Sequence, residues 1–363
     1  MTSYFARVWS VFLLAIAGSA VHAEEAQTEA LLNLNGGDEN TETALNVSFD
    51  TRIDFQNVWY DGTTDDAASG FKGKYFMLRV DGSVMDGFVD YSWRQRLNRR
   101  KENTSAFDDT DWVWVRVNHK GWHISGGKEV VLVGSWEYDK NPVDVYTFSL
   151  FWDNLPCFEF GATVARDLGP NDNLAFQVTQ SPWHTPEHNN MYAYNLLWTG
   201  HHGPYSALWS VNMMEYAPNR YINYIALGNK LSFGRVWVTV DLINRAASHQ
   251  VFLFRDFSLL SELSWRATDR WRFHMKYTFD NNHSGTAADL TVTDGTHLNM
   301  LGIGAEFNVL RRSTHNLRMH ANAIYAWGRN SNPLDALQRR TAIADIGFRW
   351  RVDLLRVKSP KRF

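Results

Sequence analysis

The most regular stretch of the chain, Trp271 to Asp280, alternates large apolar side chains with polar ones. Trp, Phe, Met, Tyr and Phe occupy one set of positions, and Arg, His, Lys, Thr and Asp occupy the other. A period of two predicts a β-strand with one apolar and one ionisable face, over about 30 Å. The preceding segment, Phe257 to Arg266, shows the same pattern, and only the short linker Ala267 to Arg270 separates the two. Lipid outside and water inside would satisfy both faces, so the pair predicts a hairpin of a transmembrane β-barrel.

Similar segments recur along the chain and predict an all-β, antiparallel barrel of about sixteen strands, with fourteen to eighteen compatible with the pattern. The fifth and tenth segments alternate least clearly. All nine prolines fall outside the segments, as expected for strands that donate to a closed ladder. The predicted strands are Ala44–Trp59, Lys74–Asp81, Gly87–Leu97, Asp111–His119, Trp122–Lys128, Phe158–Ala165, Asn173–Gln180, Met191–Trp198, Tyr205–Glu215, Tyr221–Asn229, Arg235–Asn244, Phe257–Arg266, Trp271–Asp280, His297–Leu310, Asn316–Trp327 and Thr341–Leu354.

The connections between these segments are mostly long at odd positions and short at even positions, as in outer-membrane barrels. Ala217 to Arg220 is the odd but short exception. The third connection, Glu129 to Cys157, is the longest, and much of it is apolar or aromatic. Such a loop would be costly in water, and a barrel of this size would otherwise leave a wide channel. We therefore expect it to fold into the lumen as a constriction loop. The residues assigned to the constriction are Lys128, at the end of the preceding strand, with Glu137, Asp139, Lys140 and Asp144.

The N-terminus predicts export. Arg7 precedes an apolar run from Val8 to Val21, and Val21-His22-Ala23 fits a cleavage site, so residues 1–23 are expected to be a signal peptide. Residues 24–43 contain six acidic residues and no Lys or Arg, which predicts a periplasmic lead-in. The barrel is expected over residues 44–363, in the outer membrane of a Gram-negative bacterium.

Composition supports this organisation. Aromatic residues make up 14% of the chain, and sixteen are Trp. Trp59, Trp93, Trp198, Trp265, Trp271, Trp327 and Trp350 lie on or near the outer face toward strand ends, where aromatic belts meet the lipid headgroups. Residues 44–363 hold 35 basic and 33 acidic side chains, so the barrel itself is slightly positive. The single cysteine, Cys157, excludes an intrachain disulfide, and we expect it to be an inert residue.

A channel selects solutes by the charge and width of its lining. Basic residues outnumber acidic ones on the polar strand faces, which predicts a passive pore with a mild preference for anions. These charges could instead pair across strands as a salt-bridged wall. The predicted pore-lining residues are Arg52, Arg79, Arg94, Arg96, Arg116, Arg235, Arg266, Arg272, Lys276, Arg318, Arg349 and Arg351. The opposing acids are Asp50, Asp54, Asp81, Asp90, Asp241, Glu262, Glu306 and Asp345.

Two inward aromatic residues, Trp112 and Trp114, suggest a second function. Sugar rings stack on such side chains, so the pair could form a sugar track. Filling space under the constriction loop is the alternative interpretation, and the one we favour.

The chain resembles the Gram-negative porins, and most of all the phosphate-selective porin O and P family. The resemblance rests on the signal peptide, the strand pattern over residues 44–354, and Gly126 to Lys128 ending a strand before a long third loop. It implies a homotrimer, a third loop folded into the pore, and arginine-rich walls that pass anions such as phosphate. The terminal Phe363 matches the usual assembly signal, whereas Pro360 and the basic pair after it depart from the alternation.

Other functions have less support in the sequence. No Gly-x-Ser-x-Gly motif, phosphate loop or nucleic-acid motif occurs, so we expect no enzyme, no cofactor and no nucleic-acid partner. His184 and His188, and the pair His201-His202, lack a Cys or acidic partner that would complete a metal site. A sugar-selective porin and a closed structural or anchor barrel remain the alternatives to an anion channel. A barrel hydrolase or a soluble β-sandwich would contradict more of the pattern.

Overall fold

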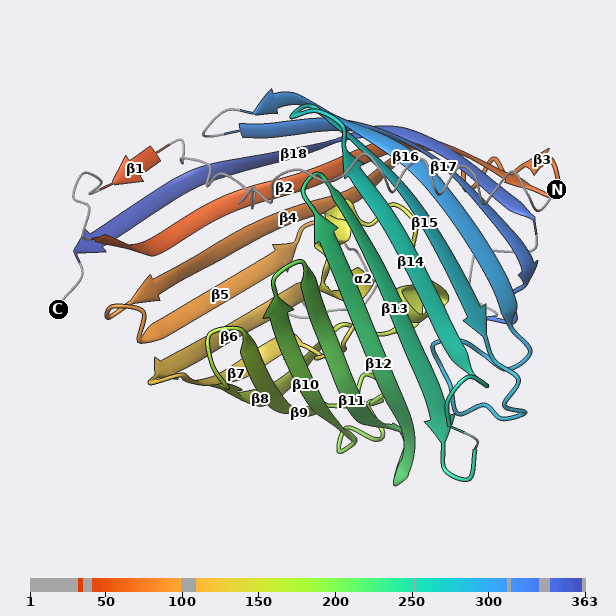
Figure 1. Ribbon diagram of the computed structural model, residues 1–363, viewed down its shortest axis with the longest axis horizontal. Helices are drawn as coiled ribbons and strands as arrows, with labels where there is room; N and C mark the ends of the chain where they lie inside the picture. Colours follow the sequence, from red (N-terminus) through yellow and green to blue (C-terminus); the bar gives the residue numbers. More distant parts are fainter. Residues whose placement is uncertain are drawn as a thin grey trace.

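The computed structural model describes residues 32–34, 41–98, 109–250, 252–311, 315–332 and 340–360. These residues form a closed barrel of sixteen antiparallel strands, in which the last strand pairs with the first (Figure 1). The predicted signal peptide, most of the lead-in and Phe363 lie outside the described residues. The barrel strands are β2 (Thr41–Tyr60), β4 (Gly70–Val84), β5 (Val89–Arg96), β6 (Thr110–His119), β7 (Trp122–Val130), β8 (Phe158–Asp167), β9 (Asp172–Gln180), β10 (Tyr192–His202), β11 (Tyr205–Ala217), β12 (Arg220–Phe233), β13 (Val236–Ala247), β14 (Phe257–Arg266), β15 (Trp271–Asn281), β16 (His297–Arg311), β17 (His315–Arg329) and β18 (Thr341–Pro360).

Side-chain burial alternates along the strands as the sequence predicts. On β15, Trp271, Phe273 and Met275 are exposed on the outer surface, whereas Lys276 and Asp280 are buried inside the barrel. An arginine or lysine on the lipid side would cost about 2 to 4 kcal/mol at the bilayer midplane. The inward direction of the ionisable face is therefore a strong constraint on strand register.

The barrel seam extends beyond the predicted limits. β2 begins at Thr41 and β18 continues to Pro360, which pairs with Thr41. The expectation that every proline lies outside the strands is therefore wrong at Pro360, which is tolerated because it is the terminal residue of its strand. A short strand, β1 (Leu32–Leu34), pairs in parallel with Leu355 to Val357 of β18, just past Val352, which pairs with His315, the first residue of β17. Residues of the predicted lead-in thus cover part of this seam.

The two rims of the barrel differ in the length of their connections. One rim has short turns, such as Lys120-Gly121 and Gly203-Pro204, and the other has the long connections, including that between β15 and β16. The short strand β3 (Thr63–Thr64) belongs to the long-connection rim, where it pairs with the end of β2. None of the helices among the described residues is long and apolar enough to cross a membrane.

The connection between β7 and β8, residues 131–157, lies inside the ring of strands (Figure 1), and we call it the lumen loop. It contains α2 (Trp136–Asp139), the 3₁₀ helix η1 (Pro142–Asp144) and α3 (Leu150–Asn154). Ser135 and Ser149 cap the two α-helices by accepting hydrogen bonds from Tyr138 N and Trp152 N. These caps satisfy amide groups that a buried helix end would otherwise leave unpaired.

An apolar core joins the lumen loop to the wall. The contacting wall residues come from β10 to β17 and from the β15–β16 connection, so the loop leans against one side of the barrel. Burial of this apolar area stabilises the inward position, at about 25 cal/mol per Å². The buried members of the core are Val131, Val133, Tyr138, Leu150, Phe151 and Leu155 of the loop, with Ala193, Met214, Ile222, Tyr224, Ala226, Ile243, Leu260, Val292, Leu298, Met300, Ile324 and Ala326 around them.

Two glycines allow the loop backbone to approach the wall closely. A Cβ atom at Gly134 would lie 2.6 Å from the carbonyl oxygen of Leu208 on β11. A Cβ atom at Gly302 on β16 would lie 2.9 Å from the Cβ of Thr147 and would overlap its hydroxyl. Neither position leaves room for a side chain, so both glycines fix how near the loop sits to the strands.

Replacing Gly302 with valine is expected to push the lumen loop away from β16. Overpacking of this kind typically costs about 1 to 3 kcal/mol, and a displaced loop leaves a wider passage. We expect a larger single-channel conductance in a planar bilayer and a lower unfolding temperature of the folded barrel. The matched control is Ala305→Val, which adds the same type of side chain to the outer face of β16. Equal conductance and unfolding temperature in the two variants would contradict this account of the loop position.

Candidate functional site

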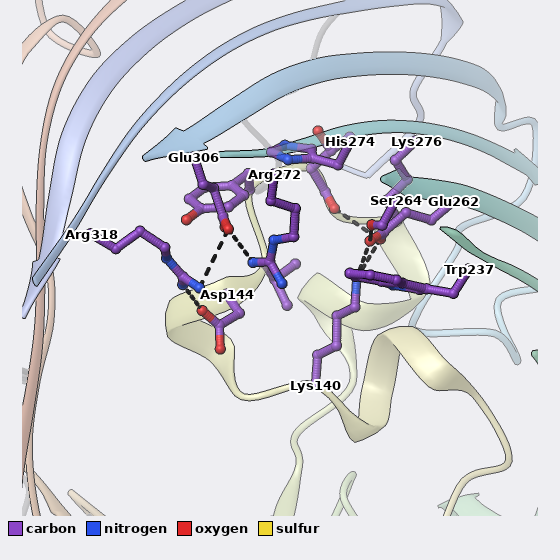
Figure 2. Close-up of a pocket in the computed structure, with 13 residues that line it drawn as sticks. Lys140, Asp144, Trp237, Glu262, Ser264, Arg272, His274, Lys276, Glu306 and Arg318 are labelled. Carbon is purple, nitrogen blue, oxygen red and sulfur yellow. Dashed lines mark hydrogen bonds and ion pairs between the residues drawn. The ribbon is translucent and has the colours of Figure 1, made fainter. Parts of the chain in front are cut away.

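Ion pairs connect the lumen loop to the opposite wall of the barrel. Figure 2 shows those of Lys140 with Glu262 and of Asp144 with Arg318. Lys140 pairs with Glu262 of β14, and Lys276 of β15 lies 2.5 Å from Glu137, which is also hydrogen bonded to Ser149. The side chains of Glu137, Glu262 and Lys276 are largely buried. Breaking a buried pair by removing one partner typically costs about 3 to 5 kcal/mol, because it leaves an uncompensated charge. These contacts hold the loop rather than leaving it free to move.

Asp144, in η1, is the most strongly held acid of the lumen loop. Arg349 of β18 donates two hydrogen bonds to its carboxylate, at 2.7 and 2.9 Å, and Arg318 of β17 pairs with the same group. Burial alone would raise the pKa of Asp144. The Arg349 and Arg318 guanidinium groups lower that pKa by a larger amount, so it lies well below its usual range. Arg349 also binds Asp50, and Arg272 and Arg318 share Glu306.

Tyr146 fixes the loop at the barrel seam. Its ring lies 4.5 Å from the Arg52 guanidinium, 4.7 Å from the His320 ring and 5.2 Å from the His274 ring. Arg52 also donates to the carbonyl oxygen of Val145 at 2.8 Å. A cation above an aromatic face gains more when both are desolvated, as they are here. Arg52 is therefore part of the loop support as well as of the lumen wall.

The wall opposite these contacts is formed by β4, β5 and β6 and carries stacked arginines. Arg94 donates to Asp111 at 2.8 Å, and its guanidinium lies 3.6 Å from the centre of the Trp112 ring. Arg96 pairs with the same Asp111 at 3.1 Å and lies over Tyr75. Because two guanidinium groups share one carboxylate, this wall keeps a positive surplus.

The bulge on β6 explains why sequence reasoning missed Asp111. Alternation assigns Asp111 to the outer face, with Val113. In the structure, Arg94 pairs with Trp112 and Gln95 with Thr110, so Asp111 is an extra residue in the ladder. A bulge redirects the side chain of its extra residue, and here it brings the carboxylate to Arg94. No feature of a single sequence locates such a bulge.

The remaining predicted lining residues fall into two groups. Arg79 lies 2.8 Å from Asp81, Arg116 stacks on Trp114 at 4.8 Å, and Arg351 lies 3.6 Å from Asp353. Arg235 and Arg266 instead lie at the short-turn rim, where Arg235 is exposed and the amide of Arg266 donates to its carbonyl oxygen. Lys128, predicted to belong to the constriction loop, instead lies near the end of β7, outside the lumen loop, on the same outward face as its ladder partners Val113 and Phe160.

Two cavities remain on either side of the lumen loop. The smaller, of about 150 Å³, lies between the loop and β13 to β17 and contains four basic residues, Lys140, Arg272, Lys276 and Arg318, against three acids, Asp144, Glu262 and Glu306 (Figure 2). The larger, of about 370 Å³, lies toward β4 to β6 and has Arg79, Arg94 and Lys140 against Asp139 alone. Both linings therefore carry more positive than negative groups.

The inward tryptophans do not present bare rings to the lumen. Trp112 has Arg94 against it and donates from its indole nitrogen to Ser92 at 2.8 Å, and Trp114 has Arg116 against it. A sugar track needs ring faces that a solute can cover. This arrangement favours an arginine-supporting role for the two rings.

One group among the described residues has the spacing of metal ligands: Asp54, His320 and Asp345, all buried. Arg52 donates to both carboxylate oxygens of Asp54, and His320 lies 2.9 Å from Asp54 and 3.6 Å from Asp345. Basic side chains thus already occupy the space between the carboxylates, and the group is explained as a buried charge network.

The two histidine pairs and the single cysteine do not come together in one site. His184 bonds to the carbonyl of Ser181, whereas His202 lies 3.1 Å from Asp172 in another part of the barrel. Burial raises the pKa of the Cys157 thiol to about 11, so little thiolate forms at neutral pH.

The sequence model of the family described as phosphate-selective porin O and P matches residues 45–208, which include the arginine-rich β4–β6 wall and the lumen loop. Over these residues the chain is similar to that family, and its closed barrel of sixteen strands has the porin fold. It is an outer-membrane channel rather than an enzyme, as the sequence predicts. No curated protein sequence matches the chain.

Solved structures share the porin's fold at low identity. An anion-selective porin from Comamonas acidovorans is 9% identical, and the alignment covers 86% of this chain and 100% of that one, with a TM-score of 0.63. The outer membrane channel DcaP of Acinetobacter baumannii is 10% identical, with 89% and 100% covered and a TM-score of 0.59. OmpT of Vibrio cholerae is 11% identical, with 88% and 99% covered and a TM-score of 0.55.

Replacing Asp144 with asparagine is expected to make the porin more selective for anions, because Arg318 and Arg349 lose their common loop partner. Stability should fall by about 1.5 to 3 kcal/mol, the usual worth of hydrogen bonds to charged groups. A depressed carboxyl pKa gives stability that is present above the unfolded value of about 3.9 and is lost as pH falls through the folded value.

The charge on Asp144 should therefore persist at pH 4. We expect the difference in reversal potential between wild type and Asp144→Asn to be the same at pH 7 and pH 4, measured in a salt gradient. Comparing the two proteins removes the effect of other acids that titrate in this range. A difference that halves at pH 4 would show an ordinary pKa and contradict the proposed pairing.

Proposed function

We propose that this porin gives passive passage to small hydrophilic solutes, with a mild preference for anions such as phosphate. The observation that carries the proposal is the charge of the two cavities beside the lumen loop, both of which have more basic than acidic lining residues. A low-dielectric passage with fixed positive groups raises the local concentration of anions. The anion-selective porin from Comamonas acidovorans, which shares the fold, is a parallel for such a pore.

The constriction residues support a mild rather than a strong preference. Glu137 and Asp144 are neutralised by wall cations, and Lys140 by Glu262. What remains unbalanced is the Arg79, Arg94 and Arg96 group on the opposite wall, where Asp81 and Asp111 supply two carboxylates. Selection by this surplus needs no energy source beyond the solute gradient.

The direct test is the reversal potential of the purified porin in a planar bilayer under a potassium chloride gradient. We expect stable steps and a reversal on the chloride side. Lys140→Gln should move the reversal toward the potassium side, because Glu262 loses its partner next to the passage. The control is Lys120→Asn, which removes the same charge at a short turn; Asn tolerates the positive φ of 48° there.

The outcomes separate the candidate functions. A reversal on the potassium side would contradict the anion preference, and the absence of conductance from correctly folded protein would favour a closed anchor barrel. Block by maltose but not by phosphate would favour a sugar-selective pore that uses Trp112 and Trp114.

We also propose a homotrimer. An apolar hollow of about 440 Å³ on the outer face includes Phe55, Phe71, Met319 and Phe348, and Phe71 is 82% exposed. A contiguous apolar surface of this kind suits either lipid or a second copy. One solved form of OmpT, which shares the fold, is described as a trimer.

Light scattering of the detergent-solubilised protein measures the number of chains. We expect three chains per particle, each lighter than the full 41.8 kDa because we propose that residues 1–23 are removed as a signal peptide on export. A particle with one chain would contradict the trimer, and an intact mass that retains residues 1–23 would contradict cleavage.

A further inference from the structure

The larger cavity beside the lumen loop has a lining that simple anion conduction does not require. Four aromatic residues and several aliphatic ones surround it together with the arginines. The aromatic residues are Trp112, Tyr138, Trp152 and Phe158. Its volume of about 370 Å³ lies in the range of small-molecule sites. A pore that passes only hydrated inorganic anions would gain nothing from these apolar walls, since such ions lose hydration against them.

Arg94 is the anchor of this cavity. Its side chain is 6% exposed, and Nε donates to Asp111. The guanidinium lies over the Trp112 ring and beside the Phe158 ring, 3.6 and 5.3 Å from their centroids. Among the described residues, Nη2 is buried without a hydrogen-bond partner. A buried donor left unpaired costs about 1 to 3 kcal/mol, so an acceptor brought by a solute would be favoured here.

Arg79 supplies a second guanidinium at the same wall. Its side chain is 45% exposed, pairs with Asp81 through Nε, and lies 5.8 Å from the Trp112 ring. Asp139 is the single acid among the lining residues, and burial raises its pKa. The cavity therefore joins an accessible guanidinium, a buried guanidinium and flat apolar surfaces within one space.

We propose that this cavity is a binding subsite for planar aromatic carboxylates of about the size of benzoate, which pass through the porin. The carboxylate pairs with the Arg79 and Arg94 guanidinium groups, whose fork geometry matches two oxygens. The ring packs against Trp152 and Phe158, where aromatic contacts add to the burial of apolar area. This inference rests on the proposed function and adds a solute class to it.

The test is block of the chloride current by added acids, measured on single porin channels in a planar bilayer. We expect benzoate to interrupt the current at a lower concentration than acetate, inorganic phosphate or cyclohexanecarboxylate. Cyclohexanecarboxylate has the same charge and a similar size but no flat ring. It therefore separates aromatic packing from charge and volume.

Arg79→Gln is expected to raise the half-blocking benzoate concentration about tenfold, which corresponds to about 1.4 kcal/mol. Arg79 is a suitable site because its side chain is exposed enough for the barrel to fold without it. The matched control is Arg116→Gln, which removes another arginine stacked on a tryptophan but does not line the cavity. Benzoate block in the control should stay within about twofold of wild type, by the same free-energy scale.

Three results would overturn the subsite. The first is block of the chloride current by benzoate at no lower concentration than acetate. The second is equal block by cyclohexanecarboxylate and benzoate, and the third is a loss of benzoate block in Arg116→Gln as large as that in Arg79→Gln. If the wild-type reversal stays on the chloride side in these experiments, the anion-porin proposal survives and only the subsite fails.

A calorimetric titration of the solubilised porin with benzoate gives a second readout that does not need conductance. Saturable heat that Arg79→Gln weakens would support the subsite even if the channel were closed. No saturable heat in wild type would overturn the subsite, whereas a failure to conduct would overturn the anion-porin proposal independently.

Discussion

The structure depends on satisfying the polar groups of a loop that is buried inside a barrel. Residues 131–157 leave the β7 edge and cross to the far wall, where water is largely excluded. Backbone and charged groups there need partners, because each unpaired one costs about 1 to 3 kcal/mol or more. The wall supplies them: Asp241 accepts from Ser135 and from the amide of Glu137, Asp280 accepts from the amide of Leu150, and Arg52 donates to Val145. The charged lining of the barrel is thus largely used to hold the loop.

This division of the wall shapes the passage. On the β13 to β18 side, positive and negative groups pair with the loop and with one another, as Arg318 and Glu306 do. On the β4 to β6 side, the loop is held less by charge, and guanidinium groups stack on aromatic rings instead. A surplus of positive charge and flat apolar surface therefore remain together at one side of the lumen. The proposed anion preference and the proposed aromatic subsite both follow from this asymmetry.

Most of the fold could be predicted from the sequence because lipid and water impose opposite demands on alternate residues. Sixteen strands, their facing and the long third connection follow from that alternation. The alternation of apolar and polar residues is weakest where the lumen loop packs against the wall. On β12, the inward residues Ile222, Tyr224 and Ala226 are apolar, so the two faces of the strand have similar polarity. The seam was misjudged at Pro360 because pairing with Thr41 extends the last strand.

The site was predicted as a set of residues but not as a set of partners. The face of the strand on which a side chain lies follows from the period of two. The partner of that side chain depends on bulges, as at Asp111, and on the position of the lumen loop, as at Tyr146. Arg235 and Arg266 were assigned to the lining, yet they lie at a rim, since alternation alone does not give depth along the barrel axis.

The central claim is that the lumen loop is held against the far wall, and a disulfide tests it most directly. Thr147→Cys with Gly302→Cys, in a Cys157→Ser background, would place the two Cβ atoms about 2.9 Å apart. This is shorter than the usual 3.5 to 4.5 Å of a disulfide, so a small outward shift of the loop, in the direction expected for Gly302→Val, brings the two sulfurs to bonding distance. The account predicts spontaneous oxidation in intact outer membranes, seen as protection of both thiols from alkylation until a reductant is added. Two thiols that remain alkylatable in the folded barrel would contradict it.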